Sequence, residues 1–408
     1  MNRFQFEDEN TIIINATNIG FKFSGIGVYS LNILKELANL QTHLNFIVYL
    51  NKTCKPHISD IKFPDNFHLI WVSSAISPDR NFKGHILRLL YSNYLSIKHR
   101  KLLIFNTSQL EVNFFRKNQI VTIHDVIPLL FKKYHLKQYP YFRLILKFGL
   151  KYAKFVLTPS IHSKELLQQI YNISEHRIRY IHNGVRTIEN KNKCPKKSAG
   201  REYILYMGRI SKMKNISNLL KAYSKIHNLT NHKLVIIGND EKLFKKELRI
   251  AGINSQIFSK IIFNQDLDEE SKNKWIRNSS LFVFPSFYEG FGLPPLEAMA
   301  NGCPVIVSNN SSLPEVCGDA AFYVNPYNPN ELSDAILKVL NNGELRKNLI
   351  ELGLKRSRQF SWRDSATEHL YVLEHVLKHS HLPENKRQME FIPILNSTPN
   401  LEFKETHG

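Results

Sequence analysis

The sequence predicts an α/β protein made of two doubly wound parallel-sheet domains that face each other across a cleft. Short apolar runs alternate with helix-forming segments along most of the chain, as they do in parallel sheets covered by helices. A polar segment, ENKNKCPKKSAG, interrupts this alternation near the middle of the chain, and the alternation then restarts. The length of 408 residues also suits two domains better than one.

The first half of the chain contains seven apolar runs short enough to be buried strands. These runs are residues 11–16, 45–50, 68–72, 102–107, 119–125, 154–160 and 178–185. Three segments with apolar residues at helical spacing lie among them, at residues 25–40, 141–153 and 162–172. We therefore expect one parallel sheet with helices packed on its faces.

The second half repeats this pattern after the polar segment. Its expected strands are residues 202–210, 233–238, 260–265, 281–286, 304–308 and 321–324. Helix-forming segments lie between these runs, so a second parallel sheet is expected. A last helix, at residues 361–381, is long enough to pack back across the hinge between the domains.

These elements divide the chain into five parts. We expect an amino-terminal domain at residues 1–190, a linker at 191–201, a carboxyl-terminal domain at 202–360, the crossing-back helix at 361–381 and a tail at 382–408. The tail is polar and contains three prolines, so it is expected to be poorly ordered. Ligands of open parallel sheets bind at the carboxyl ends of the strands, which places the expected site in the cleft between the two sheets.

Composition limits the class of protein. The chain is 43% hydrophobic, which is normal for a globular protein. It has no uncharged apolar run of 18 residues, so we expect no transmembrane helix, and its acidic amino terminus has no apolar core of a secretory signal. The four cysteines are scattered without CxxC spacing, which favours neither a zinc site nor a disulfide framework and suggests a reducing cytosol.

The net charge of +20 is concentrated in the first half of the chain. Residues 1–195 contain 27 Lys and Arg but only 12 Asp and Glu. Residues 80–110 and 126–164 contain no acid, and both segments mix cations with Leu, Ile, Tyr or Phe. Such a surface attracts nucleic acid, anionic lipid or polyanionic substrates, although an ordinary solvated face is the alternative. On the expected helix, one face would carry Arg143, Lys147, Lys151 and Lys154.

The stretch FPSFYEGFGLPPLEAMANG, residues 284–302, joins a buried strand to a helix through a glycine-rich turn. Pro294 and Pro295 suit the first helical turn, where a missing N–H group costs nothing. The free N–H groups of that turn make an anion-binding geometry. Glu289 and Glu297 flank the turn, so we predict that one faces a sugar or phosphate and the other accepts hydrogen bonds from ribose hydroxyls. Helix capping is the alternative role for either carboxylate.

Three other segments are expected to reach the cleft. Gly208, Arg209 and Lys214 follow a strand, and the two cations suit a diphosphate. Gly25 and Gly27 open the first helix and permit close backbone approach to a phosphate or sugar, but a complete dinucleotide fingerprint is absent.

His124 ends a strand in the segment VTIHDVIP, where it can hydrogen-bond a sugar hydroxyl or tune the site through its protonation. A purely structural histidine is the alternative. Neither HxxxH nor HExxH spacing occurs, and we expect no metal site.

Together these segments resemble glycosyltransferase family 4, whose members have the GT-B fold of two Rossmann-like domains. The resemblance is strongest over residues 203–323 and rests on the E-x7-E motif of Glu289 and Glu297. GRISKMKN, TPS, HNGV and SSLPEVCGDAAFYVNP are also similar to the family. It implies transfer of a sugar from a nucleotide diphosphate sugar, with retention at the anomeric carbon and without a divalent cation or other cofactor.

The resemblance also assigns roles to residues of the cleft. Arg209 and Lys214 would hold the diphosphate, Glu297 the ribose and Glu289 the donor sugar. The backbone N–H groups of Phe291, Gly292 and Leu293 would contact sugar and phosphate. His124 would reach the sugar, and Gly25 and Gly27 would approach donor and acceptor.

The motif text is most similar to bacterial polysaccharide mannosyltransferases that use GDP-mannose. Related rhamnosyl, fucosyl and UDP-glucosyl enzymes carry similar motifs, so these donors remain alternatives. A glycan or lipid-linked oligosaccharide acceptor would give the basic half a purpose. We therefore expect a cytoplasmic enzyme that is peripheral on the inner face of the cytoplasmic membrane, attracted by its anionic surface.

Two rival classes remain. A non-catalytic polyanion-binding protein on a GT-B scaffold would explain the charge but not the joint presence of Glu289, Glu297, Arg209 and Lys214. A GT-B epimerase or phosphorylase is the other, but no recognisable pyridoxal phosphate lysine motif is present. Motifs of nucleic-acid-binding folds are also missing, and we expect no nucleic acid partner.

Overall fold

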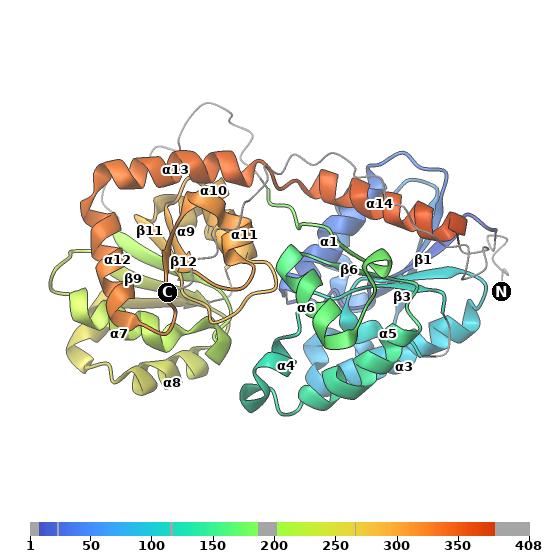
Figure 1. Cartoon of the computed structure of the whole chain (residues 1–408), viewed down its shortest axis with the longest axis horizontal. Coiled ribbons are helices and arrows are strands. Elements are labelled where there is room, and N and C mark those ends of the chain that lie inside the picture. The colour runs from blue at the N-terminus through green and yellow to red at the C-terminus, as the bar shows by residue number, and fades with distance from the viewer. Residues whose placement is uncertain (1–7, 23, 115–116, 187–201, 266, 380–408) are drawn as a thin grey trace.

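The computed structural model describes residues 8–22, 24–114, 117–186, 202–265 and 267–379. These residues form two domains, each with a parallel sheet between helices (Figure 1). The predicted fold class is thereby confirmed. The expected linker at residues 191–201 and the expected tail at 382–408 lie outside the described residues.

The first sheet has seven parallel strands in the order β3-β2-β1-β4-β5-β6-β7. The order reverses between β1 and β4, which is where ligands bind in doubly wound sheets. The strands are β1 (Thr11–Asn15), β2 (Asn45–Asn51), β3 (Phe67–Val72), β4 (Leu103–Asn106), β5 (Gln119–Thr122), β6 (Phe155–Thr158) and β7 (Ile178–Tyr180).

Helices cover both faces of this sheet. They are α1 (Gly25–Ala38), α2 (Lys55–Ile58), α3 (Asn81–Lys98), α4 (Ile127–Leu130), the π-helical segment η6 (Tyr141–Leu146), α5 (Lys147–Lys151) and α6 (Ile161–Tyr171). Side chains of β1 alternate between the faces: Ile12 packs in the cluster of α1, whereas Ile13 packs with Leu95 of α3. Val121 of β5 packs with Leu150 of α5. Therefore α3, η6, α5 and α6 share the face opposite α1.

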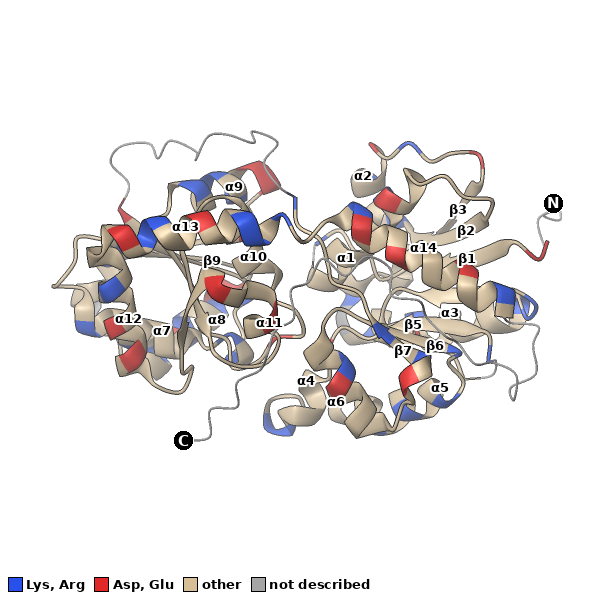
Figure 2. Cartoon of the chain, turned by 45° about the horizontal axis from the view of Figure 1, so that its top comes forward, with Lys and Arg blue, Asp and Glu red and all other residues tan. Residues whose placement is uncertain are grey.

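The second sheet has six parallel strands in the order β10-β9-β8-β11-β12-β13. Its strands are β8 (Tyr203–Met207), β9 (Lys233–Gly238), β10 (Ile261–Gln265), β11 (Leu281–Phe284), β12 (Val305–Ser308) and β13 (Ala321–Val324). Its helices are α7 (Ile216–Ile226), α8 (Glu241–Ala251), α9 (Glu269–Asn278), α10 (Leu293–Ala300), α11 (Leu313–Cys317), α12 (Pro329–Asn341) and α13 (Gly343–Ser357). Acidic and basic residues alternate along α13 (Figure 2).

Short 3₁₀ turns complete the connections. They are η1 (Lys52–Cys54), η2 (Ser74–Ile76), η3 (Pro78–Arg80), η4 (Gln109–Glu111), η5 (Lys132–Tyr134), η7 (Glu175–Arg177), η8 (Lys212–Lys214), η9 (Ser255–Lys260) and η10 (Gly318–Ala320). Two of them matter for the site: η4 follows β4 in the first domain, and η8 follows β8 in the second.

The last helix, α14 (Trp362–Lys378), crosses back to the first domain (Figure 1). Its residues Val372 and Leu373 are fully buried in the cluster that contains α1. The hydroxyl of Tyr29 lies 2.7 Å from Nε2 of His369 and 2.9 Å from Oγ1 of Thr122. A polar chain therefore links α14 to α1 and β5, and the expected crossing-back helix is confirmed.

Two details differ from the sequence prediction. The helix expected at residues 141–153 starts as the π-helical segment η6 and ends at Lys151, because the chain must turn there into β6. Lys154 lies beyond the helix, so only Arg143, Lys147 and Lys151 of the four expected cations are on it, all exposed. A further helix, α3, occupies much of the acid-free run at residues 80–110.

Among the described residues, no helix combines the length and the apolar character needed to cross a bilayer.

Candidate active site

The E-x7-E stretch forms the strand, turn and helix that its sequence predicts. Strand β11 is completely buried, and Gly292 turns the chain with a left-handed φ of +105°. A Cβ atom on Gly292 would also lie 2.7 Å from Leu313, so only glycine fits there. Helix α10 then begins at Leu293 with proline in its first turn and without a side-chain cap. Because Pro294 and Pro295 have no N–H group, the backbone donors at this helix start are the N–H groups of Gly292 and Leu293.

Lys214 and Glu289 form an ion pair in this domain. The Lys214 ammonium lies 2.5 Å and 2.6 Å from the two carboxylate oxygens, and only 20% and 9% of the two side chains are exposed. The next residue, Asn215, is left-handed, and its amide donates to the carbonyls of Pro285 and Pro326. These bonds fix the lysine loop against the end of β11. The cation expected at the diphosphate and the carboxylate expected at the sugar thus lie side by side.

Two serines of the segment SSLPEVCGDAA hydrogen-bond to the backbone of the Glu289 loop. The Oγ of Ser311 accepts a hydrogen bond from the Glu289 N–H group at 3.1 Å. The hydroxyl of Ser312 is shared between the carbonyls of Glu289 and Phe291, at 3.0 and 2.8 Å. These contacts fix both ends of the turn that leads to α10. Phe291 itself is buried in the core of the second domain.

The first domain approaches this loop at Gly290. A Cβ atom there would lie 2.1 Å from the carbonyl oxygen of His124 and 3.1 Å from Cβ of Asp125. Glycine is therefore required by the contact between the two domains. Asp125 is half-buried, its Oδ1 accepts a hydrogen bond from the N–H group of Ile127 at 3.0 Å, and burial raises its pKa. The charges of Lys214 and Glu289 act on the same carboxyl group, lowering and raising its pKa respectively.

His124 is buried at the end of β5. Its Nε2 lies 3.0 Å from the carbonyl oxygen of Thr107, and the ring meets Tyr29 edge-on at 4.6 Å between centroids. Burial lowers its pKa to about 4. The ring is therefore neutral at pH 7, donates from Nε2 and leaves Nδ1 as an acceptor. Of the two roles expected for His124, this geometry favours hydrogen bonding over a change in protonation.

Glu297 lies on α10, half-buried. Its pKa is raised to about 7, first by burial and then by repulsion from Glu269, while Lys272 and Arg186 act in the opposite direction. Removing this carboxylate from water therefore has a cost that a hydrogen-bonding ligand can offset. A perturbed carboxyl group beside a helix N-terminus is the pattern of a functional site.

The remaining predicted residues lie at the edges of the site. Arg209 is exposed just after β8, and its carbonyl accepts a hydrogen bond from the Tyr206 hydroxyl at 3.1 Å. The N–H group of Gly27 is taken by Ser24, which caps α1, whereas Gly25 is exposed with open space around it. Over the described part of the chain, neither Arg209 nor these glycines hydrogen-bond to Lys214 or Glu289. The same residues contain no group of three or more His, Cys, Asp or Glu side chains placed to hold a metal ion.

Sequence reasoning missed a carboxylate that joins the two domains. Glu315 of α11 accepts hydrogen bonds from the N–H groups of Ile161 and His162 at 2.8 and 3.1 Å, and thereby caps α6 of the first domain. The ring of His182 lies 2.7 Å from the same carboxylate. Nearby, the carbonyl of Gly290 accepts hydrogen bonds from the hydroxyls of Ser160, which caps α6, and of Ser163 in its first turn. The sequence analysis noted the segments TPS and SSLPEV as similar to the family, but nothing in the sequence showed that they contact each other.

Comparison with known proteins identifies the family of this chain. One family model, Glycosyltransferase Family 4, matches residues 23–189, and another, Glycosyl transferases group 1, matches residues 187–356. Together these models cover residues 23–356, which include every strand of the two sheets except β1. The family indicated by the sequence motifs is thereby confirmed.

Two relatives match most of the chain. The O-antigen chain mannosyltransferase RfbU of Salmonella typhimurium is 26% identical over 336 residues, covering 80% of this chain and 90% of the relative. The O-antigen chain mannosyltransferase B of Escherichia coli is 26% identical over 398 residues, covering 88% and 97%.

Solved structures show the same fold at lower identity. A sucrose-phosphate synthase from Thermosynechococcus elongatus superposes with a TM-score of 0.72 at 20% identity, covering 90% of this chain and 99% of the other. WaaG, a glycosyltransferase involved in lipopolysaccharide biosynthesis, gives 0.64 at 15% identity, covering 89% and 99%. Both likenesses support the fold alone.

Proposed function

The chain belongs to the glycosyltransferases of family 4 with the GT-B fold, and from this premise we propose that it transfers mannose from GDP-mannose to a glycan acceptor with retention at the anomeric carbon. That it is a glycosyltransferase follows from its family. The donor and the stereochemistry are the proposal. The observation that supports a nucleotide diphosphate donor is the Lys214–Glu289 pair, in which Glu289 lies in the turn before the N-terminus of α10.

The proposed chemistry follows from where charge develops. Cleavage of the anomeric C–O bond leaves positive charge on the sugar and negative charge on the diphosphate. Lys214, Arg209 and the backbone N–H groups of Gly292 and Leu293 would take up the negative charge, and groups already in place need no reorganisation. Positive charge from these groups is why the proposal includes no divalent cation.

Lys214 must exchange partners during this reaction. In the structure its ammonium is neutralised by Glu289. A bound diphosphate would draw Lys214 toward itself, and Glu289 would then be released to accept a hydrogen bond from a sugar hydroxyl. Glu297 would accept hydrogen bonds from the ribose, and the neutral ring of His124 would serve a sugar hydroxyl. Front-face substitution, assisted by the leaving phosphate, would give retention.

The choice of mannose rests on motif similarity and on the relatives. Both relatives that span most of the chain are named as O-antigen chain mannosyltransferases. We extend that donor class to this chain, with surface polysaccharide as the product. Rhamnosyl, fucosyl and UDP-glucosyl transfer are the competing donors, and nucleotide binding separates the last of them from the first choice.

We also propose a lipid-linked oligosaccharide as the acceptor and a peripheral position on the inner face of the cytoplasmic membrane. The excess of cations in the first half of the chain supports this location, because each cation near an anionic leaflet contributes about 1 kcal/mol.

The donor is tested by isothermal calorimetry with GDP and with UDP, each in the presence of EDTA. We expect GDP to bind in the micromolar range and UDP to bind more weakly. Lys214→Ala and Glu297→Ala should weaken GDP binding by about 10- to 100-fold, as expected for loss of a charge-assisted hydrogen bond. Lys212→Ala is the matched control, since Lys212 lies in the same turn but pairs with Glu247 at 3.1 Å.

Each other outcome changes a specific part of the proposal. Tight UDP binding without GDP binding would overturn the mannose donor and leave the fold and reaction class. If neither nucleotide bound, the polyanion-binding scaffold would become the better explanation. Equal losses in Lys212→Ala and Lys214→Ala would remove the role given to Lys214.

A further inference from the structure

Helix α3 buries mostly polar side chains and exposes mostly apolar ones. Four of the side chains that it buries are polar, namely Arg88, Ser92, Asn93 and Ser96, and they lie beside the buried Leu95. Its outward side instead carries Phe82 (64% exposed), Ile86 (41%), Leu87 (42%), Leu90 (62%), Tyr94 (52%) and Ile97 (54%). A surface helix normally shows the opposite arrangement, with its apolar side toward the core. A long apolar stripe at the surface marks an interaction site.

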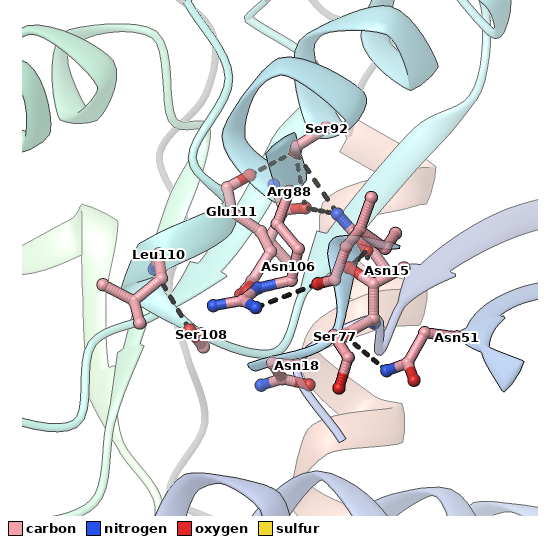
Figure 3. Close-up of polar contacts among 12 residues, drawn as sticks. Asn15, Asn18, Asn51, Ser77, Arg88, Ser92, Asn106, Ser108, Leu110 and Glu111 are labelled. Atoms are coloured by element: carbon pink, nitrogen blue, oxygen red, sulfur yellow. Dashed lines mark hydrogen bonds and ion pairs between the residues drawn. The ribbon is translucent and has the colours of Figure 1, made fainter. Parts of the chain in front are cut away.

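Buried polar contacts hold α3 in this orientation (Figure 3). The Nε of Arg88 lies 3.1 Å from a carboxylate oxygen of Glu111, and both side chains are almost completely buried. Arg88 also donates to the carbonyl of Ile76 at 3.0 Å, while the Ser92 hydroxyl donates to the carbonyl of Glu111. A rotation that buried the apolar stripe would strand a buried charge, which costs about 3–5 kcal/mol when one partner of such a pair is lost. The buried contacts of Arg88 and Ser92 therefore keep the apolar stripe at the surface.

The apolar surface continues beyond α3. Helix α5 and the segment η6 lie on the same face of the first sheet, and the rings of His85 and Tyr141 join them to α3 at 5.3 Å between centroids. Large apolar side chains are exposed there as well, at Leu144, Ile145 and Phe148. The loop around α4 adds Leu130, Tyr134 and Leu136. We call the exposed surface of residues 82–98 and 130–151 the basic–apolar face.

This face carries positive charge and no exposed carboxylate. Between residues 81 and 154 the only acids are Glu111, which is buried with Arg88, and Asp125, which is half-buried beside the active site. Exposed cations lie among the apolar side chains, namely Lys83, Lys98, Lys132, Lys133, Lys137, Arg143, Lys147 and Lys151. The second domain differs, because acidic and basic residues alternate along α13 (Figure 2).

We propose that the basic–apolar face docks on an anionic lipid bilayer. Cations attract the anionic headgroups, and the exposed apolar side chains can enter the headgroup and acyl boundary. A nucleic acid would use the cations but not the twelve large apolar side chains exposed on this face, and the observed mixture favours lipid. The inference rests on the proposed function in one respect: docking would bring a lipid-linked acceptor to the cleft.

The position of α4 supports that link. The ring of Phe131, which follows α4, lies 6.1 Å from the ring of Tyr288 in the second domain. Tyr288 directly precedes Glu289 of the ion pair. One end of the basic–apolar face therefore reaches the contact between the domains, next to the candidate active site.

Flotation with lipid vesicles tests the apolar part of the proposal. The full-length protein is mixed with vesicles of phosphatidylglycerol and phosphatidylcholine, or of phosphatidylcholine alone. We expect flotation with the anionic vesicles, and a loss of at least about tenfold in partitioning for Leu90→Glu and for Phe148→Glu. Leu229→Glu is the matched control, because Leu229 is 67% exposed but lies in the second domain, and it should float like the wild type.

The cationic part is tested by neutralisation. Replacement of Lys132, Lys133 and Lys137 by Gln should reduce partitioning by about fivefold per cation and weaken its dependence on salt. The same change at the exposed lysines Lys242, Lys245 and Lys246 of α8 should have little effect. Circular dichroism and calorimetric GDP binding of every variant separate loss of docking from misfolding and from failure of the proposed function.

Three results would overturn the proposal. In the first, the wild type ignores anionic vesicles. In the second, Leu90→Glu and Leu229→Glu reduce flotation equally. In the third, sedimentation velocity finds a dimer that Leu90→Glu dissociates while vesicles remain unbound, and a second copy of the chain would then cover the face.

Discussion

At the scale of single residues, the site is defined by charges that neutralise one another. Lys214 is paired with Glu289, and the charges of both residues act on the pKa of the Asp125 carboxyl group. In the proposed reaction, a diphosphate would therefore compete with the Glu289 carboxylate for the Lys214 ammonium. Under the proposed function, donor binding would be weakened by the Glu289 charge and sugar transfer would depend on it, and mutation can separate these two effects.

Glu289→Gln should bind GDP more tightly while transferring sugar more slowly. Loss of the negative charge frees the Lys214 ammonium, which should improve GDP affinity by up to about tenfold. Transfer should fall by about 100-fold or more, because a positioned group at the reacting sugar is weakened. Calorimetry and a donor-turnover assay measure the two effects. Weaker GDP binding in this variant would contradict the exchange of partners, and Lys212→Ala controls for a change in the neighbouring turn.

Glu297 predicts a pH dependence of nucleotide binding. Its pKa of about 7 means that the carboxyl group is largely protonated below that pH and cannot accept two ribose hydroxyls as an anion. Ligand binding to the ionised form should therefore strengthen as pH rises from 6 to 8 and level off above. Calorimetry of GDP binding across this range measures the effect. Glu297→Gln has no carboxyl group to titrate and should lose the Glu297-dependent part of the slope; an unchanged slope would assign it to another group.

At the scale of elements, the N-termini of two helices decide how the domains meet. Helix α10 has no side-chain cap, which suits a ligand, whereas α6 is capped by Glu315 from the opposite domain. The ring of His182 contacts the same carboxylate. The carbonyl of Gly290 accepts hydrogen bonds from the hydroxyls of Ser160 and Ser163. Polar contacts at the edge of the site thus hold the two domains together.

Glu315→Ala should loosen the contact between the domains. Two N–H groups of α6 and the ring of His182 lose their acceptor, at a cost of about 1–3 kcal/mol. We expect a lower midpoint in denaturant unfolding and a larger radius of gyration by small-angle scattering. Glu351→Ala is the control, since Glu351 pairs only with Lys347 at 4.0 Å on an exposed part of α13. A radius equal to that of the control would show that Glu315 does not hold the domains together.

At the scale of the whole molecule, the chain ties its two domains together twice. The connection after β7 leads into the second domain, and α14 returns to the first, where it completes the core beside α1. The first domain therefore contains residues from both ends of the described chain. Its stability depends on a helix that follows the second domain in sequence.

Leu373→Ala should destabilise the first domain. Leu373 is fully buried between α14 and α1, so its truncation leaves a cavity and should cost about 2–5 kcal/mol. Chemical denaturation measures the loss, and hydrogen exchange of β1 and β2 locates it. The exposed Leu229→Ala should change stability by less than about 0.5 kcal/mol. Selective loss of protection in β8 and β9 instead would show that α14 supports the second domain.

The sequence determined the features that depend on neighbours along the chain. Buried strands, the glycine turn at Gly292 and the helix start at Leu293 follow from local pattern, and so does the E-x7-E spacing. These features were sufficient to predict two parallel sheets and the family. Lys214 and Glu289 were predicted as members of one site because each follows a strand of the same sheet.

Only the tertiary structure decided which distant groups meet and which way a helix faces. The approach of Asp125 to the ion pair and the cap that Glu315 gives to α6 join segments from different domains, and no local pattern pairs such segments. Helix α3 gives the clearest case. Its sequence has a polar side and an apolar side, but periodicity does not say which side is buried. The Arg88–Glu111 pair decides this, because separating a buried ion pair costs more free energy than leaving a leucine side chain exposed.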